Sequence, residues 1–339
     1  MNTQYLHKQL ATWYGSNHRI LPWRETSDPY RIWLSEIILQ QTRVAQGYDY
    51  YLRFIERFPD VMSLAAASED EVMLLWQGLG YYSRARNLHK AAREVAERYG
   101  GVFPPDYAAV RALSGVGDYT AAAVCSFAWN MPYAVVDGNV YRLLSRLTDD
   151  DTPIDTTNGR KRFQALADRL LDPANPRLHN QTMMELGALV CTPQNPQCSL
   201  CPIVSLCKAE AAGTAALLPV KGKSAPLKDR YLTYIIYKSS NHTLLCQRHG
   251  KDIWQHLYEF PLLESDRLLE ADELGLSPLW QADFVHILSH QRLHARFFLA
   301  SVASLPQQDG TFPVAWSSLS DYALSRLTLR ALETLPLDL

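Results

Sequence analysis

The chain has 339 residues, of which 47% are hydrophobic and 20% charged, and its formal net charge is −2. This length suits two or three domains, each able to bury its own core, and the composition excludes a largely disordered chain. No apolar run is long enough to span a membrane, and the N-terminus lacks the layout of a secretory signal peptide. We therefore expect a protein of the cytoplasm that does not bind membranes.

The first two hundred residues read as a succession of helices. Apolar residues recur at three and four spacing, and Pro, Gly or Asp-Pro breaks separate the segments. Asp28 and Pro29 begin one segment as a helix cap and a first-turn proline. The expected helices are 3–16, 29–41, 44–57, 61–77, 82–99, 118–128, 138–147, 159–171 and 178–190.

The near-neutral net charge means that any nucleic-acid footprint has to be a local basic patch. Three clusters on the expected helices are candidates, although the solvated faces of ordinary helices look the same. They are Arg84, Arg86, Lys90 and Arg93; Arg142 and Arg146; and Arg160, Lys161 and Arg162.

A glycine-punctuated turn, LSGVGDYT, lies between two helical segments. Gly115 and Gly117 flank one apolar residue, which suits a tight turn with positive φ and close approach of the backbone to a ligand. The helix expected over 118–128 would direct its orphan amides and partial positive charge at this turn. A phosphate fits there, as in a helix-hairpin-helix clamp on a DNA backbone. The alternative is an ordinary pair of core helices.

Four of the six cysteines follow the pattern Cys-x6-Cys-x2-Cys-x5-Cys. In a reducing cytoplasm disulfides are an improbable use for such a cluster, so the spacing predicts a metal site. Four thiolates suit either zinc or a 4Fe-4S cluster, and the spacing alone does not decide between them. The ligands are Cys191, Cys198, Cys201 and Cys207. We expect the two isolated cysteines, Cys125 and Cys246, to be small buried hydrophobic residues.

Glu36 lies in an otherwise apolar helical segment, WLSEIILQQTRV. Burial disfavours the charged form of a carboxyl group, so we expect a raised pKa, as a general acid requires. The alternative is a structural glutamate that is paired with a helix cap or with a core arginine.

The sequence changes character after Cys207. Residues 212–229 combine small residues, two prolines and basic groups without periodicity, which indicates a linker. From residue 231 two strand-like runs flank a short polar turn at 239–242, and RLHARFFLASV alternates in the same way. These patterns predict a separate α+β domain.

Six stretches together resemble the adenine DNA glycosylase (MutY) family of the endonuclease III superfamily, over roughly residues 3–210. They are LPWR, WLSEIILQQTRV, GLGYYSRARNL, LSGVGDYT, VVDGNVYRLLSR and the cysteine loop. The resemblance implies a multidomain fold: an all-α helix-hairpin-helix glycosylase region at 1–211, built as a six-helix barrel plus an iron–sulfur module with its loop at 191–207. A linker at 212–229 and a Nudix-like α+β domain at 230–339 would follow. It also implies that the four cysteines hold a 4Fe-4S cluster.

The same resemblance implies the chemistry. Neutral Glu36 would protonate N7 of adenine and later help activate water, while ionised Asp137 would face the sugar as positive charge develops there. Tyr119 stands where the lyases of the superfamily carry the Schiff-base lysine, so a monofunctional glycosylase is expected. Asn139 and Arg24 would line the same pocket.

The DNA contacts implied by the resemblance lie in both domains. Gln41 and Tyr81 would fill the gap left by the extruded base, and the glycine turn would hold the backbone. In the C-terminal domain, Ser289 and His290 would read 8-oxoguanine opposite the adenine. Leu288 replaces the aromatic residue of the family's reading loop, so stacking by this loop is doubtful. The segment LLESDRLLEADELGL lacks the paired glutamates of an active Nudix hydrolase, so no pyrophosphatase activity is expected.

We therefore expect a monomeric enzyme that binds double-stranded DNA and removes adenine mispaired with 8-oxoguanine or guanine. In a bacterium it would associate with the nucleoid. Two alternatives stay open at this point. One is an endonuclease III-like glycosylase that acts on another base, and the other is an iron–sulfur DNA-binding or redox module without catalysis.

Overall fold

The computed structural model describes residues 2–222 and 226–336. The chain forms two compact units, which are described separately. The first comprises Met1–Ala65 and Lys90–Lys223, and the second comprises Ala66–His89 and Ser224–Leu339. Part of the expected linker, residues 223–225, lies outside the described residues.

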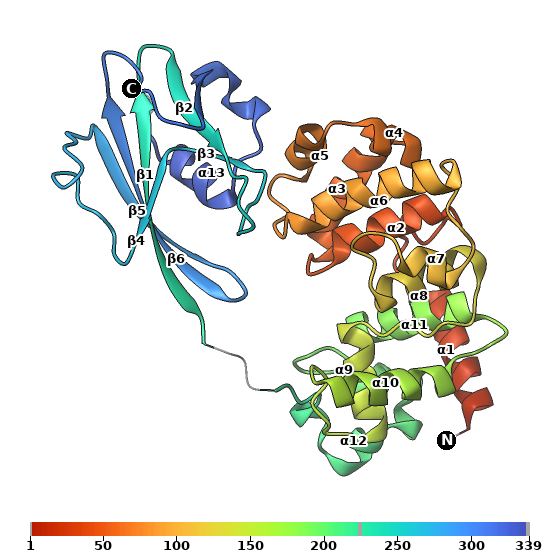
Figure 1. Cartoon of the computed structure of the whole chain (residues 1–339). Coiled ribbons are helices and arrows are strands. Elements are labelled where there is room, and N and C mark those ends of the chain that lie inside the picture. The colour runs from red at the N-terminus through yellow and green to blue at the C-terminus, as the bar shows by residue number, and fades with distance from the viewer. Residues whose placement is uncertain (1, 223–225, 337–339) are drawn as a thin grey trace. The chain divides into compact units, whose positions relative to one another are not determined.

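The first unit is helical throughout its described part (Figure 1). Its α-helices are α1 (Thr3–Asn17), α2 (Pro29–Leu39), α3 (Val44–Arg57), α4 (Val61–Ala66), the second half of α6 (Ser83–Tyr99), α7 (Tyr107–Arg111), α8 (Asp118–Trp129), α9 (Gly138–Thr148), α10 (Thr157–Leu170), α11 (Pro176–Leu189) and α12 (Lys208–Ala212). Short 3-10 turns η1 (Cys198–Leu200), η2 (Val204–Leu206) and η3 (Ala215–Leu217) flank α12.

Side-chain caps explain where several helices begin. Asp28 accepts a hydrogen bond from the backbone of Tyr30, and Pro29 occupies the first turn of α2 as the sequence predicts. Ser68 caps α5 (Glu69–Trp76) through the backbone N–H of Glu71. The single helix expected over 61–77 is therefore wrong, because this serine starts a new helix after the end of α4.

Two helix pairs bring distant parts of the chain together. Helix α2 packs on α8, and the start of α9 packs on α11. At the second contact Gly187 lies so close to Asn139 that a Cβ atom on the glycine would be 2.7 Å from the Cβ of Asn139. The core beneath is built from buried apolar side chains of α1, α9, α10 and α11, among them Leu10, Val140, Phe163 and Leu186. These contacts set the starts of α8 and α9 opposite α2.

The expected glycine turn joins α7 to α8. Gly115 has φ +73°, a conformation that side-chain-bearing residues rarely adopt, so the prediction of positive φ is confirmed there. Gly117 has an ordinary φ of −90° and forms the N-cap of α8. Its role is therefore that of a cap without a side chain, and the prediction of positive φ is wrong for this glycine.

The second unit contains two sheets besides α5 and the first half of α6. A four-stranded sheet has the order β4 (Leu262–Ser265), β1 (Lys228–Lys238), β6 (Gln291–Ser301), β5 (Trp280–Ile287). A three-stranded sheet has the order β3 (Tyr258–Glu259), β2 (His242–Gln247), β7 (Thr311–Ala315). The 3-10 turn η4 (Trp316–Asp321) and helix α13 (Arg326–Glu333) follow.

The α+β character expected for the C-terminal region is confirmed. Strands β1 and β2 flank the turn at 239–241, and β6 contains the predicted alternating run. Strands β1 and β6 run parallel, and across them Tyr234 stacks on Phe297 with ring centroids 4.5 Å apart. Leu327 and Ala331 of α13 complete this core. Among the described residues no helix is long and apolar enough to cross a membrane.

Candidate active site and iron–sulfur site

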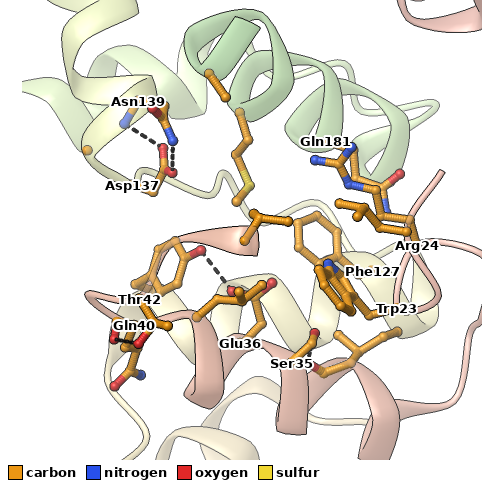
Figure 2. Close-up of a pocket in the computed structure, with 18 of the residues that line it drawn as sticks. Trp23, Arg24, Ser35, Glu36, Gln40, Thr42, Phe127, Asp137, Asn139 and Gln181 are labelled. Carbon is orange, nitrogen blue, oxygen red and sulfur yellow. Dashed lines mark hydrogen bonds between the residues drawn. The ribbon is translucent and has the colours of Figure 1, made fainter. Parts of the chain in front are cut away.

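A cavity of about 380 Å³ opens between α2, the starts of α8 and α9, and the middle and end of α11 in the first unit. Its walls carry five residues predicted from the sequence, together with the exposed Gln41. Figure 2 shows four of the five, Arg24, Glu36, Asp137 and Asn139, around this cavity. The five are Arg24, Glu36, Tyr119, Asp137 and Asn139. These side chains come from two segments of the chain, and even Glu36 and Tyr119 are 83 residues apart, so only folding brings them together.

Glu36 projects from α2 into this cavity and is 7% exposed. The Tyr119 hydroxyl donates a hydrogen bond of 2.8 Å to its carboxyl group. The pKa of Glu36 is raised to about 7, chiefly by burial. The Tyr119 hydrogen bond lowers this pKa, the nearby Asp137 raises it and Arg24 lowers it. A carboxyl group with this pKa can hold a proton near neutral pH and can give it to a base.

Asp137 is the N-cap of α9, and its carboxylate accepts three hydrogen bonds. Two come from Asn139, its backbone N–H at 2.9 Å and its side-chain amide at 2.7 Å (Figure 2). The third comes from the backbone N–H of Val140 at 2.8 Å. Burial raises the pKa of Asp137, and these three donors oppose that rise because they favour the ionised form. Asp137 therefore accepts three hydrogen bonds that favour its ionised form, whereas Glu36 accepts one, from Tyr119.

A second glutamate lies behind two arginines that line the cavity, and its environment is the opposite of that of Glu36. Glu185 on α11 is completely buried and pairs with Arg19 at 2.7 Å and Arg24 at 2.6 Å. Burial alone would raise the pKa of Glu185, but hydrogen bonds from both arginines lower it to about 2. Arg24 is thus held in place by Glu185, which the sequence analysis missed. Its only sequence signal was a glutamate within an apolar helix.

The two residues predicted to fill the gap left by the extruded base share an uncommon backbone conformation. Gln41, at the edge of the cavity, has φ +55°, and Tyr81, in the second unit, has φ +47°. Such values are rare for residues with side chains, and they cluster at functional sites. Tyr81 is half-exposed, and its hydroxyl lies 2.9 Å from that of Ser289 within the same unit. Two residues predicted to contact DNA therefore lie together there.

The reading loop at the tip of the β5–β6 hairpin exposes Ser289 and His290. Leu288 instead packs against the apolar core of the second unit, and its backbone N–H bonds to the carbonyl of Gln291. The leucine thus anchors the hairpin in this structure. Because Leu288 is packed on this core and is not aromatic, we do not expect the loop to stack on a base.

The prediction of basic patches is wrong for the pair Arg142 and Arg146 and for part of the group at 84–93, because these arginines are buried. Arg84 and Arg142 are 8% exposed and Arg146 is 2% exposed. Arg86 is partly buried and donates to the carbonyl of Gln255. Arginines on apolar helix faces are indistinguishable from solvated ones until the packing is known. The exposed members are Lys90, Arg93, Arg160, Lys161 and Arg162.

Buried Arg142 links the start of α9 to the cysteine loop. Its guanidinium donates to the side-chain carbonyl of Asn139 at 2.9 Å, to the carbonyl of Gly187 at 2.6 Å and to the carbonyl of Cys191 at 2.6 Å. Asn139 in turn donates to Asp137. One chain of hydrogen bonds therefore runs from the carboxylate of Asp137 to the first cysteine.

The four predicted metal ligands surround one small cavity beside α9 and α12. Among the described residues, no three His, Cys, Asp or Glu side chains are placed to hold a single metal ion. Of the two isolated cysteines, Cys125 is buried as expected and Cys246 is only partly buried.

Hydrogen-bond donors point at three of these sulfurs. Arg146 donates to the sulfur of Cys191 at 3.3 Å and to the carbonyls of Thr192 and Pro193 in the loop that follows. Backbone N–H groups point at the sulfurs of Cys201 and Cys207. Such donors stabilise cluster thiolates. The site therefore fits a 4Fe-4S cluster held by its four cysteines.

The second unit does not arrange its glutamates as a metal site. Residues 266–279, where a Nudix hydrolase would carry its catalytic helix, form turns and irregular structure. Glu264, Glu270 and Glu273 are each ion-paired with an arginine, at 2.7, 2.6 and 2.5 Å respectively. The absence of pyrophosphatase activity stays a prediction.

Comparison with family models identifies three regions. Residues 34–168 match the HhH-GPD superfamily of base excision DNA repair proteins, residues 191–207 match the iron–sulfur binding domain of endonuclease III, and residues 232–334 match the NUDIX domain. The adenine DNA glycosylase of Buchnera aphidicola (subspecies Baizongia pistaciae) is 31% identical over 307 residues, which cover 88% of this chain and 86% of the relative. The chain belongs to the adenine DNA glycosylase family.

Some relatives are longer than this chain and match it over a shorter stretch. The adenine DNA glycosylase of Mus musculus is 46% identical over 209 residues, which cover 59% of this chain and 41% of the mouse protein. This chain thus matches less than half the length of that relative. The chain is a DNA glycosylase, a hydrolase of base excision repair, and it carries a 4Fe-4S cluster.

Solved structures support the helical fold. A thermostable thymine-DNA glycosylase is 28% identical, with a TM-score of 0.56 over 62% of this chain and 97% of that one. Endonuclease III in a non-covalent DNA complex is 22% identical, with a TM-score of 0.52 over 63% of this chain and 98% of that one. The helical fold is therefore shared with a thymine-DNA glycosylase and with endonuclease III.

Replacing Tyr119 by Phe should move the pH dependence of base release. Glu36 must be protonated to act as an acid, so the single-turnover rate should fall as pH rises through about 7. Loss of the Tyr119 hydrogen bond, which lowers the pKa of Glu36, should shift that fall to higher pH. Tyr5→Phe, at an exposed position on α1, is the control. An unshifted alkaline limb in Tyr119→Phe would contradict the assigned contact.

Replacing Gly187 by Ala should damage stability and activity together. The new Cβ would lie 2.7 Å from the Cβ of Asn139 and 2.9 Å from its carbonyl oxygen, so the start of α9 must shift. Overpacking of this kind lowers the free energy of unfolding by about 1–3 kcal/mol. Gly15→Ala, where no atom lies within 4 Å, is the matched control. Urea unfolding and single-turnover base release measure both effects, and wild-type values in Gly187→Ala would refute the predicted clash.

Proposed function

We propose that this enzyme removes adenine mispaired with 8-oxoguanine or with guanine in double-stranded DNA and leaves an abasic site. The observation that carries the proposal is the pairing of Glu36, bonded to Tyr119, with Asp137 in one cavity. One carboxyl group favours its protonated form and the other accepts three hydrogen bonds as an anion would. Hydrolysis of a glycosidic bond requires this division of labour.

The reaction then follows from the charges. Adenine is a poor leaving group until a ring nitrogen is protonated, so Glu36 gives its proton to N7 while the C1′–N9 bond breaks. The electron pair of that bond stays with the base, and positive charge develops on the sugar. Ionised Asp137 stabilises this charge. A water molecule then adds to C1′ and returns a proton to Glu36, which restores the enzyme.

Tyr119 supports the hydrolytic outcome. Burial raises the pKa of this phenol well above its usual range, and the charges of Glu36 and Asp137 raise it further. Tyr119 therefore remains a neutral hydrogen-bond donor at neutral pH. A lysine at this position would offer an amine to the sugar, so the tyrosine favours attack by water and a monofunctional enzyme.

Adenine has to leave the duplex to reach this cavity, at a cost of a few kcal/mol that is smaller at a mismatch. Gln41, held at the mouth with positive φ, is suited to enter the space that the base leaves. The turn at Gly115 and Gly117 would hold a phosphate on backbone N–H groups and on the positive end of α8. Tyr81 would act from the second unit.

In this proposal the base opposite adenine is recognised by the β-rich second unit. Ser289 and His290 are exposed at a hairpin tip and carry a hydroxyl and an imidazole that can bond the edges distinctive of 8-oxoguanine. The boundaries 1–211, 212–229 and 230–339, the monomeric state and the cytoplasmic location remain part of this proposal. The cluster at Cys191–Cys207 would hold its loop in shape and would take no part in hydrolysis.

Replacing Asp137 by Asn should slow adenine release about a thousandfold, because the charge that stabilises the transition state is lost. The assay uses duplexes with adenine opposite 8-oxoguanine, adenine opposite guanine, thymine opposite guanine, and an oxidised pyrimidine, each cleaved with alkali after incubation. Wild type should break only the adenine strands. Asp168→Asn, at an exposed carboxylate of α10, is the control. Release at the parent rate, or breakage of another strand, would overturn the proposal.

Replacing Ser289 by Ala should reduce the preference for 8-oxoguanine over guanine opposite adenine by about fivefold, as loss of one hydrogen bond predicts. The rate on the adenine–guanine duplex should change little. Ser239→Ala alters another turn serine of the same unit, whose hydroxyl bonds the carbonyl of Ala303, and should leave the preference intact. If the two variants discriminate equally well, Ser289 does not read the lesion.

A further inference from the structure

The turn expected to hold a DNA phosphate is surrounded by acidic side chains. Asp118 is the first residue of α8, where its charge suits the helix dipole but opposes an incoming anion. Glu94 accepts hydrogen bonds from the backbone N–H of Ser114 at 2.8 Å and from its hydroxyl at 2.7 Å. One amide of the turn is therefore already used by a carboxylate, and two carboxylates flank the turn.

One cation is bonded directly into the same turn. Arg111, the last residue of α7, donates from Nε to Asp118 at 2.6 Å and from Nη1 to the carbonyl of Val116 at 2.9 Å. Among the described residues, its Nη2 has no hydrogen-bond partner. The side chain is 45% exposed and that of Asp118 is 82% exposed. The guanidinium thus crosses the turn, with one edge held by protein and one nitrogen turned to solvent.

This geometry differs from that of an isolated surface ion pair. An exposed pair contributes little because both side chains are mobile, whereas Arg111 is fixed by a backbone carbonyl as well as by a carboxylate. A guanidinium presents donors in a rigid fork that matches the oxygens of a phosphate. With Nε and Nη1 engaged, Nη2 is the donor left for such a ligand.

We propose that Arg111 is a DNA-contacting residue of this enzyme, which neutralises Asp118 and donates from its solvent-facing nitrogen to the phosphate held at the turn. The inference rests on the proposed contact of the turn with DNA. Without Arg111 the turn would present two carboxylates to a polyanion. In this chain the cation of the clamp comes from the end of the preceding helix and reaches across the turn.

Variants at both positions separate a phosphate contact from simple neutralisation. The measurement is the affinity for a duplex with a stable abasic-site analogue, which is not cleaved, taken over a series of salt concentrations. Arg111→Ala should weaken binding about tenfold and should lower the slope of log affinity against log salt by about 0.9, the value for one lost phosphate contact. Arg111→Lys should keep most of the slope because it keeps the charge. Asp118→Asn should bind about threefold more tightly.

The decisive comparison is Arg111→Ala in the Asp118→Asn background. If Arg111 contacts phosphate, the double variant still binds more weakly than Asp118→Asn and has the reduced slope. If Arg111 only neutralises Asp118, the double variant binds as Asp118→Asn does, and the inference is overturned. Thermal unfolding of each variant confirms that the turn remains folded in the proteins compared.

A matched control and a second readout keep this test independent of the proposed function. Arg326→Ala removes the arginine of another exposed ion pair, with Glu333 at 2.9 Å and side chains 53% and 57% exposed, and should change neither affinity nor slope. The second readout is adenine release by the wild-type enzyme, measured in parallel with binding. If wild type releases adenine but Arg111→Ala binds DNA as wild type does, Arg111 is not a DNA contact and the proposed function stands. If wild type releases no adenine, the proposed function itself is refuted.

Discussion

Burying the carboxyl group of Glu36 in the same cavity as Asp137 is the constraint on which the active site depends. Removing a carboxyl group from water disfavours its ionised form, and a second carboxylate nearby disfavours it further. The fold supplies one direct hydrogen bond to Glu36, from Tyr119, and leaves its pKa at about 7. A group that is unfavourable to bury is therefore kept protonated near the pH at which an acid is useful.

Glu185 shows that burial alone does not create an acid. Both glutamates lie in apolar helices and line or adjoin the same cavity, yet Glu185 is bonded by Arg19 and Arg24, and its pKa falls to about 2. The arginines convert it into a fixed anion that positions Arg24. The difference between a proton donor and a structural anion thus lies in the partners that the fold provides.

The position of Asp137 depends on contacts that extend well beyond the cavity. Asn139 bonds the carboxylate, Arg142 bonds Asn139, and the same guanidinium bonds the carbonyls of Gly187 and Cys191. A cluster held by the cysteines would fix that end of the chain of hydrogen bonds. This arrangement links the iron–sulfur site structurally to the carboxylate in the cavity.

The amino-acid sequence by itself determined most of the helices, the α+β character of the second part, the four cysteine ligands and the types of residue at the site, because caps, periodicity and ligand spacing are local properties. It did not separate buried from exposed arginines: Arg142 and Arg146 have the same local pattern as solvated residues, and packing alone made them structural. Nor does an apolar neighbourhood along the chain reveal the partners of a buried glutamate: the sequence pointed to Glu36 but gave no role for Glu185. Only the tertiary structure decided which glutamate met a tyrosine and which met two arginines, because those partners come from segments far away in the chain, and electrostatics depends on distance in space.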